Sequence, residues 1–268
     1  LHGMREKEAV TTDFTQGAAP GGAHHIPYRT ALVEWIADIC EDFRFGLTTA
    51  SLAVLYMDRV LSRIYVAKNS LQLVAMCCLL IAAKYEELEQ KVPKLSRFQE
   101  TARNLYSAEH ICKMEVALLC EMGWRLSYVT AAHFLEAFLM LTNGGTGAGD
   151  AVGGAGGGGS WTPESVGYLH RYAGFFLTLS LEDWDVTTET VPSKLAAAVL
   201  AAARAHLQIQ PAWPQSLQAV TGYDAGDLAA VASQVVRLYN DKFGEGPPGE
   251  SEAVYAQLEK EAAAGAGG

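Results

Sequence analysis

Residues 70–87 constrain the fold most, because apolar side chains occupy almost every position of this segment. Side chains such as Val74, Leu80 and Ile81 would cover all faces of an α-helix. A helix that is apolar all round belongs at the centre of a helical bundle. It is too short to cross a bilayer, since Leu71–Ala83 spans about 13 residues and a membrane span needs about 20.

Amphipathic helical segments flank this central one, each with apolar residues three or four positions apart. In the first half of the chain they cover residues 28–43, 49–64, 93–102 and 107–122. The second half repeats the plan around a very Ala-rich segment, with helices predicted at 131–141, 164–181, 192–207, 216–221 and 228–243. No convincing run of alternating strand residues occurs. The sequence therefore predicts the all-α class, with two tandem five-helix bundles.

The same pattern predicts where the domains begin and end. An N-terminal segment, 1–27, precedes a first bundle at 28–126 and a second at 127–245. The Gly-rich stretch at 143–160 cannot bury apolar area, so it is predicted to be a mobile loop. The tail, 246–268, is predicted to be flexible, with at most a marginal isolated helix.

The net charge and the positions of the cysteines indicate which kinds of binding partner and metal site to expect. The chain carries 30 acidic and 20 basic residues, a net charge of -10, which disfavours binding to nucleic-acid phosphates and favours protein partners. Its five cysteines lie in apolar helical segments and show no spacing typical of zinc ligands. They are expected to be reduced core residues of an intracellular protein. No metal, cofactor or membrane partner is predicted.

Four segments carry a resemblance to a known family. They are LAVLYMDRVLSRIYVAKNSLQLVAMCCLLIAAKYEE at 52–87, YRTALVEWI at 28–36, WPQSLQAVTGY at 213–223 and MREKE at 4–8. In their order and spacing along the chain, these segments resemble the cyclin family, the A- and B-type (mitotic) cyclins in particular, as an N-terminally truncated form. The segment MREKE at 4–8 is similar to the short helix that precedes the first cyclin box.

The resemblance implies a non-catalytic regulatory subunit that binds and activates a cyclin-dependent protein kinase in cell-cycle control, in the nucleus and cytoplasm. By similarity, Lys84, Glu87 and Glu115 contact the kinase. From the residues alone, Lys84 would complement the dipole at its helix C-terminus, and Glu115 would be a solvated carboxylate. The resemblance also implies a buried structural ion pair between Arg29 and Asp58, joining the first two helices of the box.

A second implied surface is a groove that recruits substrate or inhibitor peptides with Arg-x-Leu type motifs. Tyr28 and Ala31 depart from the Met and Ile that are usual in the family, which alters the shape of the groove. A Trp on an amphipathic helix is otherwise a core residue. The matching positions are Tyr28, Ala31, Leu32, Trp35, Asp38, Leu71 and Gln72.

Several other residues and functions also come into consideration from the sequence. His24 and His25 are interpreted as loop histidines, and Glu182, Asp183 and Asp185 as a solvated junction in preference to a metal site. The alternative function is a cyclin-fold adaptor, or a transcription factor IIB-like nucleic-acid-binding protein, without kinase activation. An enzyme in an all-helical fold ranks last, because neither a phosphate-binding Gly loop nor a GxSxG nucleophile motif occurs.

Overall fold

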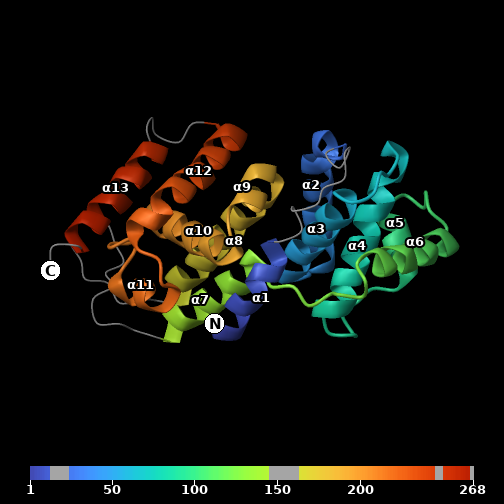
Figure 1. Ribbon diagram of the computed structural model, residues 1–268, viewed down its shortest axis with the longest axis horizontal. Helices are drawn as coiled ribbons and strands as arrows, with labels where there is room; N and C mark the ends of the chain where they lie inside the picture. The colour runs from blue at the N-terminus through green and yellow to red at the C-terminus, as the bar shows by residue number, and fades with distance from the viewer. Residues whose placement is uncertain (13–23, 145–162, 245–249, 266–268) are drawn as a thin grey trace. The chain divides into compact units, whose positions relative to one another are not determined.

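The computed structural model describes residues 1–12, 24–144, 163–244 and 250–265, and this part of the chain contains helices and no strand (Figure 1). The predicted all-α class is confirmed. The helices are α1 (His2–Thr12), α2 (Ile26–Phe43), α3 (Leu47–Leu61), the 3-10 turn η2 (Lys68–Ser70), α4 (Leu71–Glu86), α5 (Leu95–Thr101), α6 (Ala108–Glu121), α7 (Ala131–Gly144), α8 (Pro163–Glu182), α9 (Trp184–Glu189), α10 (Pro192–His206), α11 (Gln215–Thr221), α12 (Ala225–Phe243) and α13 (Glu250–Gly265).

The chain forms two compact units. The first unit contains Arg5–Thr130 together with the short segment Leu181–Trp184. The second contains Leu1–Met4, Ala131–Ser180 and Asp185–Gly268. The segment Leu181–Trp184 is thus distant in sequence from the rest of its unit, which ends at Thr130.

In the first unit, α4 is the central helix, as its composition predicts. Every residue from Leu73 to Ala83 is buried. Helices α2, α3 and α6 pack against it, and α5 packs against α6. Phe98 of α5 is fully buried, and its ring contacts the rings of Phe43 and Phe45.

A side chain caps the N-terminus of α6. The Ser107 hydroxyl accepts a hydrogen bond from the backbone N–H of His110 at 3.2 Å. This bond satisfies one of the amide groups that the first turn of a helix leaves without a partner. The local sequence Ser-Ala-Glu-His therefore sets the start of the helix that carries Glu115.

In the second unit, the Ala-rich helix α10 is the core helix. It is buried from Leu195 to Arg204 and packs against α7 and α12. Phe176 brings α8 into the same core through ring contacts with His206 of α10 and Tyr239 of α12. Small alanine side chains favour close approach of the surrounding helices, so this segment contributes packing.

The expectation of a flexible tail at 246–268 is wrong for Glu250–Gly265, which forms α13 and packs on α12. Val254 and Leu258 are buried, and the Glu261 carboxylate accepts hydrogen bonds from the backbone N–H groups of Ala212 (3.0 Å) and Trp213 (2.9 Å). Tertiary contacts stabilise a helix that would be marginal in isolation. The predicted loop at 143–160 falls outside the described residues except for its first two positions.

Replacing Glu261 with alanine is expected to lower the free energy of unfolding of the second unit by about 1–3 kcal/mol, because two part-buried amide donors lose their acceptor. Chemical denaturation followed by circular dichroism measures the change. Glu259→Ala, an exposed position on the same helix, is the matched control and should change stability little. Equal effects of the two substitutions would contradict a structural role for Glu261.

Candidate protein-binding site

The structure brings Lys84 and Glu115 together at the surface of the first unit. Lys84 lies in the last turn of α4, and its Nζ is 2.5 Å from Glu115 Oε1 on α6. The Lys84 side chain is 50% exposed and that of Glu115 is 15% exposed. Ion pairs this open to water contribute at most about 1 kcal/mol to folding. The pair is therefore better suited to meeting a partner than to holding the bundle together.

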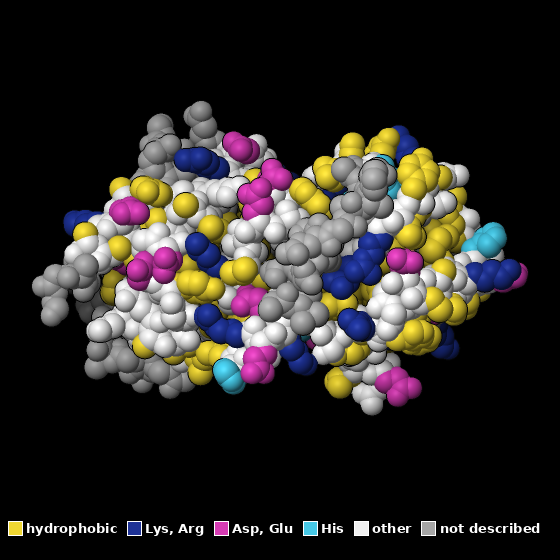
Figure 2. All heavy atoms as spheres, in the orientation of Figure 1, with side chains coloured by type: hydrophobic (Ala, Val, Ile, Leu, Met, Phe, Trp, Pro, Cys, Tyr) yellow, Lys and Arg dark blue, Asp and Glu magenta, His cyan; other side chains and the backbone are white. Residues whose placement is uncertain are grey.

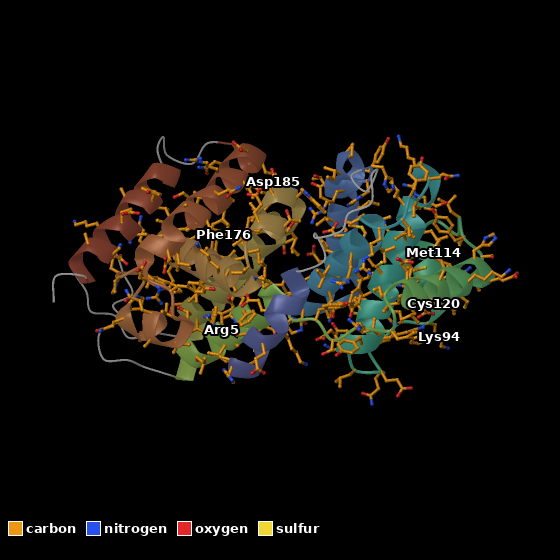
Figure 3. All side chains as sticks on the ribbon, in the orientation of Figure 1. Arg5, Lys94, Met114, Cys120, Phe176 and Asp185 are labelled. Carbon is orange, nitrogen blue, oxygen red and sulfur yellow. The ribbon has the colours of Figure 1, made fainter. Side chains whose placement is uncertain are left out.

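Two contacts show that α4 and α6 run in the same direction. Cys77 Sγ lies 3.7 Å from the Ile111 carbonyl oxygen, and further along both helices Lys84 meets Glu115. Figure 3 labels Met114 and Cys120, two residues of α6. The C-terminal ends of the two helices consequently lie at the same end of the bundle.

Large exposed apolar side chains lie close in sequence to the ion pair and to the C-terminal ends of the two helices. Tyr85 and Leu88 follow Lys84, and Trp124 comes just after α6. Leu88 and Trp124 are 68% and 65% exposed. Exposed large apolar groups near a charge pair are typical of protein-binding surfaces. These residues define the α4–α6 surface: Lys84, Tyr85, Leu88, Glu115 and Trp124.

Trp124 is a residue of this surface that sequence reasoning missed. It has a positive φ of 59°, directly after Gly123 with the same φ, and its N–H donates to the Leu119 carbonyl at 2.9 Å. A bulky residue in the left-handed region is uncommon and is kept only where its surroundings impose it. The Gly-Trp pair immediately after the last apolar turn of α6 was the available signal, since it places the Trp beyond the core.

Glu87, the third residue expected to contact the kinase, is bound to the chain's own atoms. Its Oε1 accepts hydrogen bonds from the Gly46 N–H (2.6 Å) and the Thr49 hydroxyl (2.8 Å), and Lys91 approaches its Oε2 at 3.4 Å. Burial alone would raise the pKa of this carboxyl, but these hydrogen bonds and the nearby Lys91 charge outweigh burial and lower it. Glu87 thus ties the end of α4 to the start of α3, and its contact with a kinase stays a prediction.

The Glu87→Gln variant is expected to lose stability at neutral pH relative to the parent chain, because an amide keeps the shape but removes the charge. Since the pKa of Glu87 is lowered on folding, its contribution is present above the unfolded value near 4.5 and is lost as pH falls through the lower folded value. Denaturation at pH 7 and at about pH 3 should therefore show a difference that shrinks on acidification. A difference that is constant over this range would contradict the assignment.

The structure contains the ion pair expected between Arg29 of α2 and Asp58 of α3. The guanidinium donates to both carboxylate oxygens, from Nε at 2.9 Å and Nη2 at 2.8 Å, and both side chains are almost fully buried. Arg29 Nη1 also donates to the carbonyl oxygens of Leu181 (2.8 Å) and Glu182 (3.0 Å). One arginine therefore joins two helices of the first unit to the segment that is distant from them in sequence.

The residues expected to form a peptide-docking groove divide into two groups. Leu32 and Leu71 are buried, so they belong to the core of the bundle, and Trp35 packs partly against that core. Tyr28, Ala31 and Asp38 are exposed, and Gln72 is half-buried. Lys68 Nζ lies 4.6 Å from the centroid of the Tyr28 ring, a cation–π contact that covers part of this surface.

One further expectation needs correction. Cys40, Cys77 and Cys78 are buried, but Cys112 and Cys120 are exposed, because they lie on the side of α6 that faces away from α4.

His24 and His25 lie in the turn that precedes α2, in agreement with their interpretation as loop histidines. His25 is fully buried beside Trp184, and His24 accepts a hydrogen bond from the Val66 N–H.

The acidic residues at 182–185 lie at the junction of α8 and α9. Within the described residues, no three His, Cys, Asp or Glu side chains are grouped closely enough to hold a metal ion. In the same part of the chain no helix is long and apolar enough to span a membrane.

Comparison with known proteins agrees with this architecture. Residues 4–127 match the cyclin N-terminal domain and residues 129–261 match the cyclin C-terminal domain. The chain therefore belongs to the cyclin family, whose members are regulatory, non-catalytic subunits that partner with cyclin-dependent kinases.

Two relatives show how far the similarity extends. The chain is 41% identical to Cyclin-D of Ostreococcus tauri over 230 residues, which is 83% of this chain and 59% of that protein. It is 28% identical to G2/mitotic-specific cyclin-A of Hydra viridissima, over 79% of this chain and 45% of that protein. The chain thus spans about half the length of these relatives.

Two solved structures share the fold. A viral cyclin from herpesvirus saimiri matches with a TM-score of 0.64 at 18% identity, covering 81% of this chain and 88% of the viral one. A chain of the yeast RNA Pol II CTD kinase CTDK-1 complex matches with a TM-score of 0.61 at 14% identity, covering 93% and 80%.

Proposed function

We propose that this chain binds a cyclin-dependent Ser/Thr protein kinase and activates it in cell-cycle control. The main support for this proposal is the α4–α6 surface, which combines the Lys84–Glu115 ion pair with large exposed apolar side chains. Membership of the cyclin family supports it, as does the structural likeness to a chain from a kinase complex.

The mechanism is a shift in the kinase's conformational equilibrium. Kinase catalysis requires a Lys–Glu ion pair between strand β3 and the C-helix of the kinase, together with an ordered activation loop. A bundle that binds the catalytically competent arrangement more tightly than the inactive one increases its population. Every 1.4 kcal/mol of differential binding changes the ratio of the two states about tenfold.

In this proposal Lys84 donates its free N–H groups to carbonyl oxygens of the kinase, while Glu115 fixes the direction of the lysine side chain. Trp124 and Leu88 supply apolar area near that polar contact. Burial of the surface by the kinase would strengthen the ion pair, and loss of one partner would leave the other charge unpaired.

The finer class is part of the proposal. The relatives include D-type as well as A- and B-type cyclins, so assignment to the A/B-type and to mitosis stays a prediction. Recruitment of substrates through peptides of Arg-x-Leu type also stays a prediction, as does a nuclear and cytoplasmic location. The exposed Tyr28, Ala31 and Asp38 support the docking role, whereas Lys68 over Tyr28 narrows the surface that a peptide could use.

A reconstitution experiment tests the proposal. The chain is mixed with purified cyclin-dependent kinases, and phosphate transfer to a peptide substrate is measured. At least one kinase is expected to gain activity by about two orders of magnitude or more in proportion to the chain added. Absence of both binding and activation across the set of kinases would overturn the proposal.

A further inference from the structure

The loop between α3 and α4 presents an aromatic and basic surface that the proposed kinase contact does not use. Tyr65 is 77% exposed, the largest exposed fraction among the large hydrophobic side chains of the described residues, and Ile64 beside it is exposed as well. Arg63 and Lys68 are exposed on the same loop, and the exposed Tyr28 lies under Lys68. Figure 2 shows many hydrophobic side chains at the surface of the unit that contains α2 to α6.

Contacts within the chain hold this loop in place. The His24 ring packs on the Tyr65 ring with centroids 4.7 Å apart, and His24 Nε2 accepts a hydrogen bond from the Val66 N–H at 3.2 Å. The Ile64 N–H donates to the Val60 carbonyl at 3.0 Å, so the loop continues from the end of α3 with fixed geometry. A surface ordered before binding avoids much of the entropy loss of association.

The local charge differs in sign from that of the chain as a whole. The chain carries a net charge of -10, but no Asp or Glu occurs between Asp58 and Glu86. Asp58 is buried in its ion pair with Arg29, and the next acidic residue after Tyr28 on α2 is Glu34, about 9 Å further along the helix. Arg63 and Lys68 therefore face solvent without an acidic residue on their own loop.

From these observations we infer that His24, Tyr28, Arg63, Ile64, Tyr65 and Lys68, the α3–α4 loop surface, bind an acidic peptide segment that contains an aromatic or large aliphatic residue. Tyr65 and Ile64 contact the apolar side chain of this segment, and Arg63 and Lys68 pair with its carboxylates. Tyrosine and arginine are enriched among residues that dominate binding energy, and complementary charge speeds and orients association.

This surface is separate from the α4–α6 surface, because Leu71 and Lys84 lie near opposite ends of α4, about 20 Å apart along the helix. Single-stranded nucleic acid would also meet aromatic and basic groups. Two exposed cations on a chain of net charge -10 are few for phosphate binding, which favours a peptide.

Selection of random peptides of about 12 residues, displayed on phage, against the immobilised full chain tests the inference. The enriched peptides are expected to be acidic and to contain an aromatic or large aliphatic residue. Fluorescein-labelled copies should bind the Arg63→Glu/Lys68→Glu chain at least tenfold more weakly and the Tyr65→Ala chain several-fold more weakly. Arg97→Glu, a charge reversal at an exposed arginine on α5, is the matched control and should leave binding unchanged.

Three outcomes would overturn the inference: no enriched peptide, enriched peptides without excess acid, or affinity that survives the double charge reversal. Binding of an oligothymidine to the parent chain, lost in the same double variant, would assign the surface to nucleic acid instead. Kinase activation should be unchanged by the double reversal, so failure here and failure of the proposed function are distinguishable.

Discussion

Replacing Arg29 with alanine is expected to lower the free energy of unfolding of the first unit by about 3–5 kcal/mol. The substitution leaves the buried Asp58 carboxylate without its two guanidinium hydrogen bonds and removes the donor to the Leu181 and Glu182 carbonyl oxygens. An uncompensated buried charge accounts for most of the expected loss. Urea denaturation followed by circular dichroism measures it.

The Arg97–Glu100 pair on α5 provides the control for this prediction. Its charged atoms approach to 2.7 Å, but the side chains are exposed, so Arg97→Ala should change stability by less than about 1 kcal/mol. The double variant Arg29→Met/Asp58→Leu should recover much of the loss, since it removes both buried charges. An Arg29→Ala chain as stable as the Arg97→Ala chain would contradict the role assigned to the pair.

Replacing Trp124 with alanine is expected to weaken kinase binding by about 2–4 kcal/mol, which is roughly 30- to 1000-fold in Kd. The side chain is exposed in the free chain, so folding should be spared while apolar area at the edge of the α4–α6 surface is lost. Isothermal titration calorimetry with the kinase that responds in reconstitution gives the affinity.

Leu105→Ala is the matched control for the tryptophan. Leu105 is equally exposed but precedes α6, whereas Trp124 follows it, so the two lie about 20 Å apart along the helix. Its removal should change affinity little. Similar losses for the two variants would indicate that the binding surface lies elsewhere on the unit.

The sequence predicted the helical framework because periodicity is a local property. Segments such as 70–87 and 192–207 reveal burial through their own composition, and both are central helices in the structure. Helices α9 and α13 show no such pattern of burial in their own composition. Helix α9 has only six residues, and α13 depends on Val254, Leu258 and the hydrogen bonds of Glu261.

In the candidate site, too, local features could be predicted from the sequence and contacts between distant residues could not. The sequence resemblance implied both Lys84 and Glu115, but periodicity could not bring together two side chains 31 positions apart. The role of Glu87 depends on the amide of Gly46, which is 41 positions away in sequence. Cys120 is expected in the core because it is apolar, but apolar type indicates burial only on average. Which side of α6 faces α4 is fixed by packing, and Cys120 is exposed.

The most direct test of kinase activation through the α4–α6 surface is a titration of kinase activity with the Lys84→Ala/Glu115→Ala chain. The control is Glu109→Ala/Lys113→Ala, which removes an ion pair of 2.6 Å on the solvent side of the same helix. We expect half-maximal activation to require at least about 100-fold more of the first variant, while the control matches the parent chain. Equal half-maximal concentrations for all three chains would contradict it.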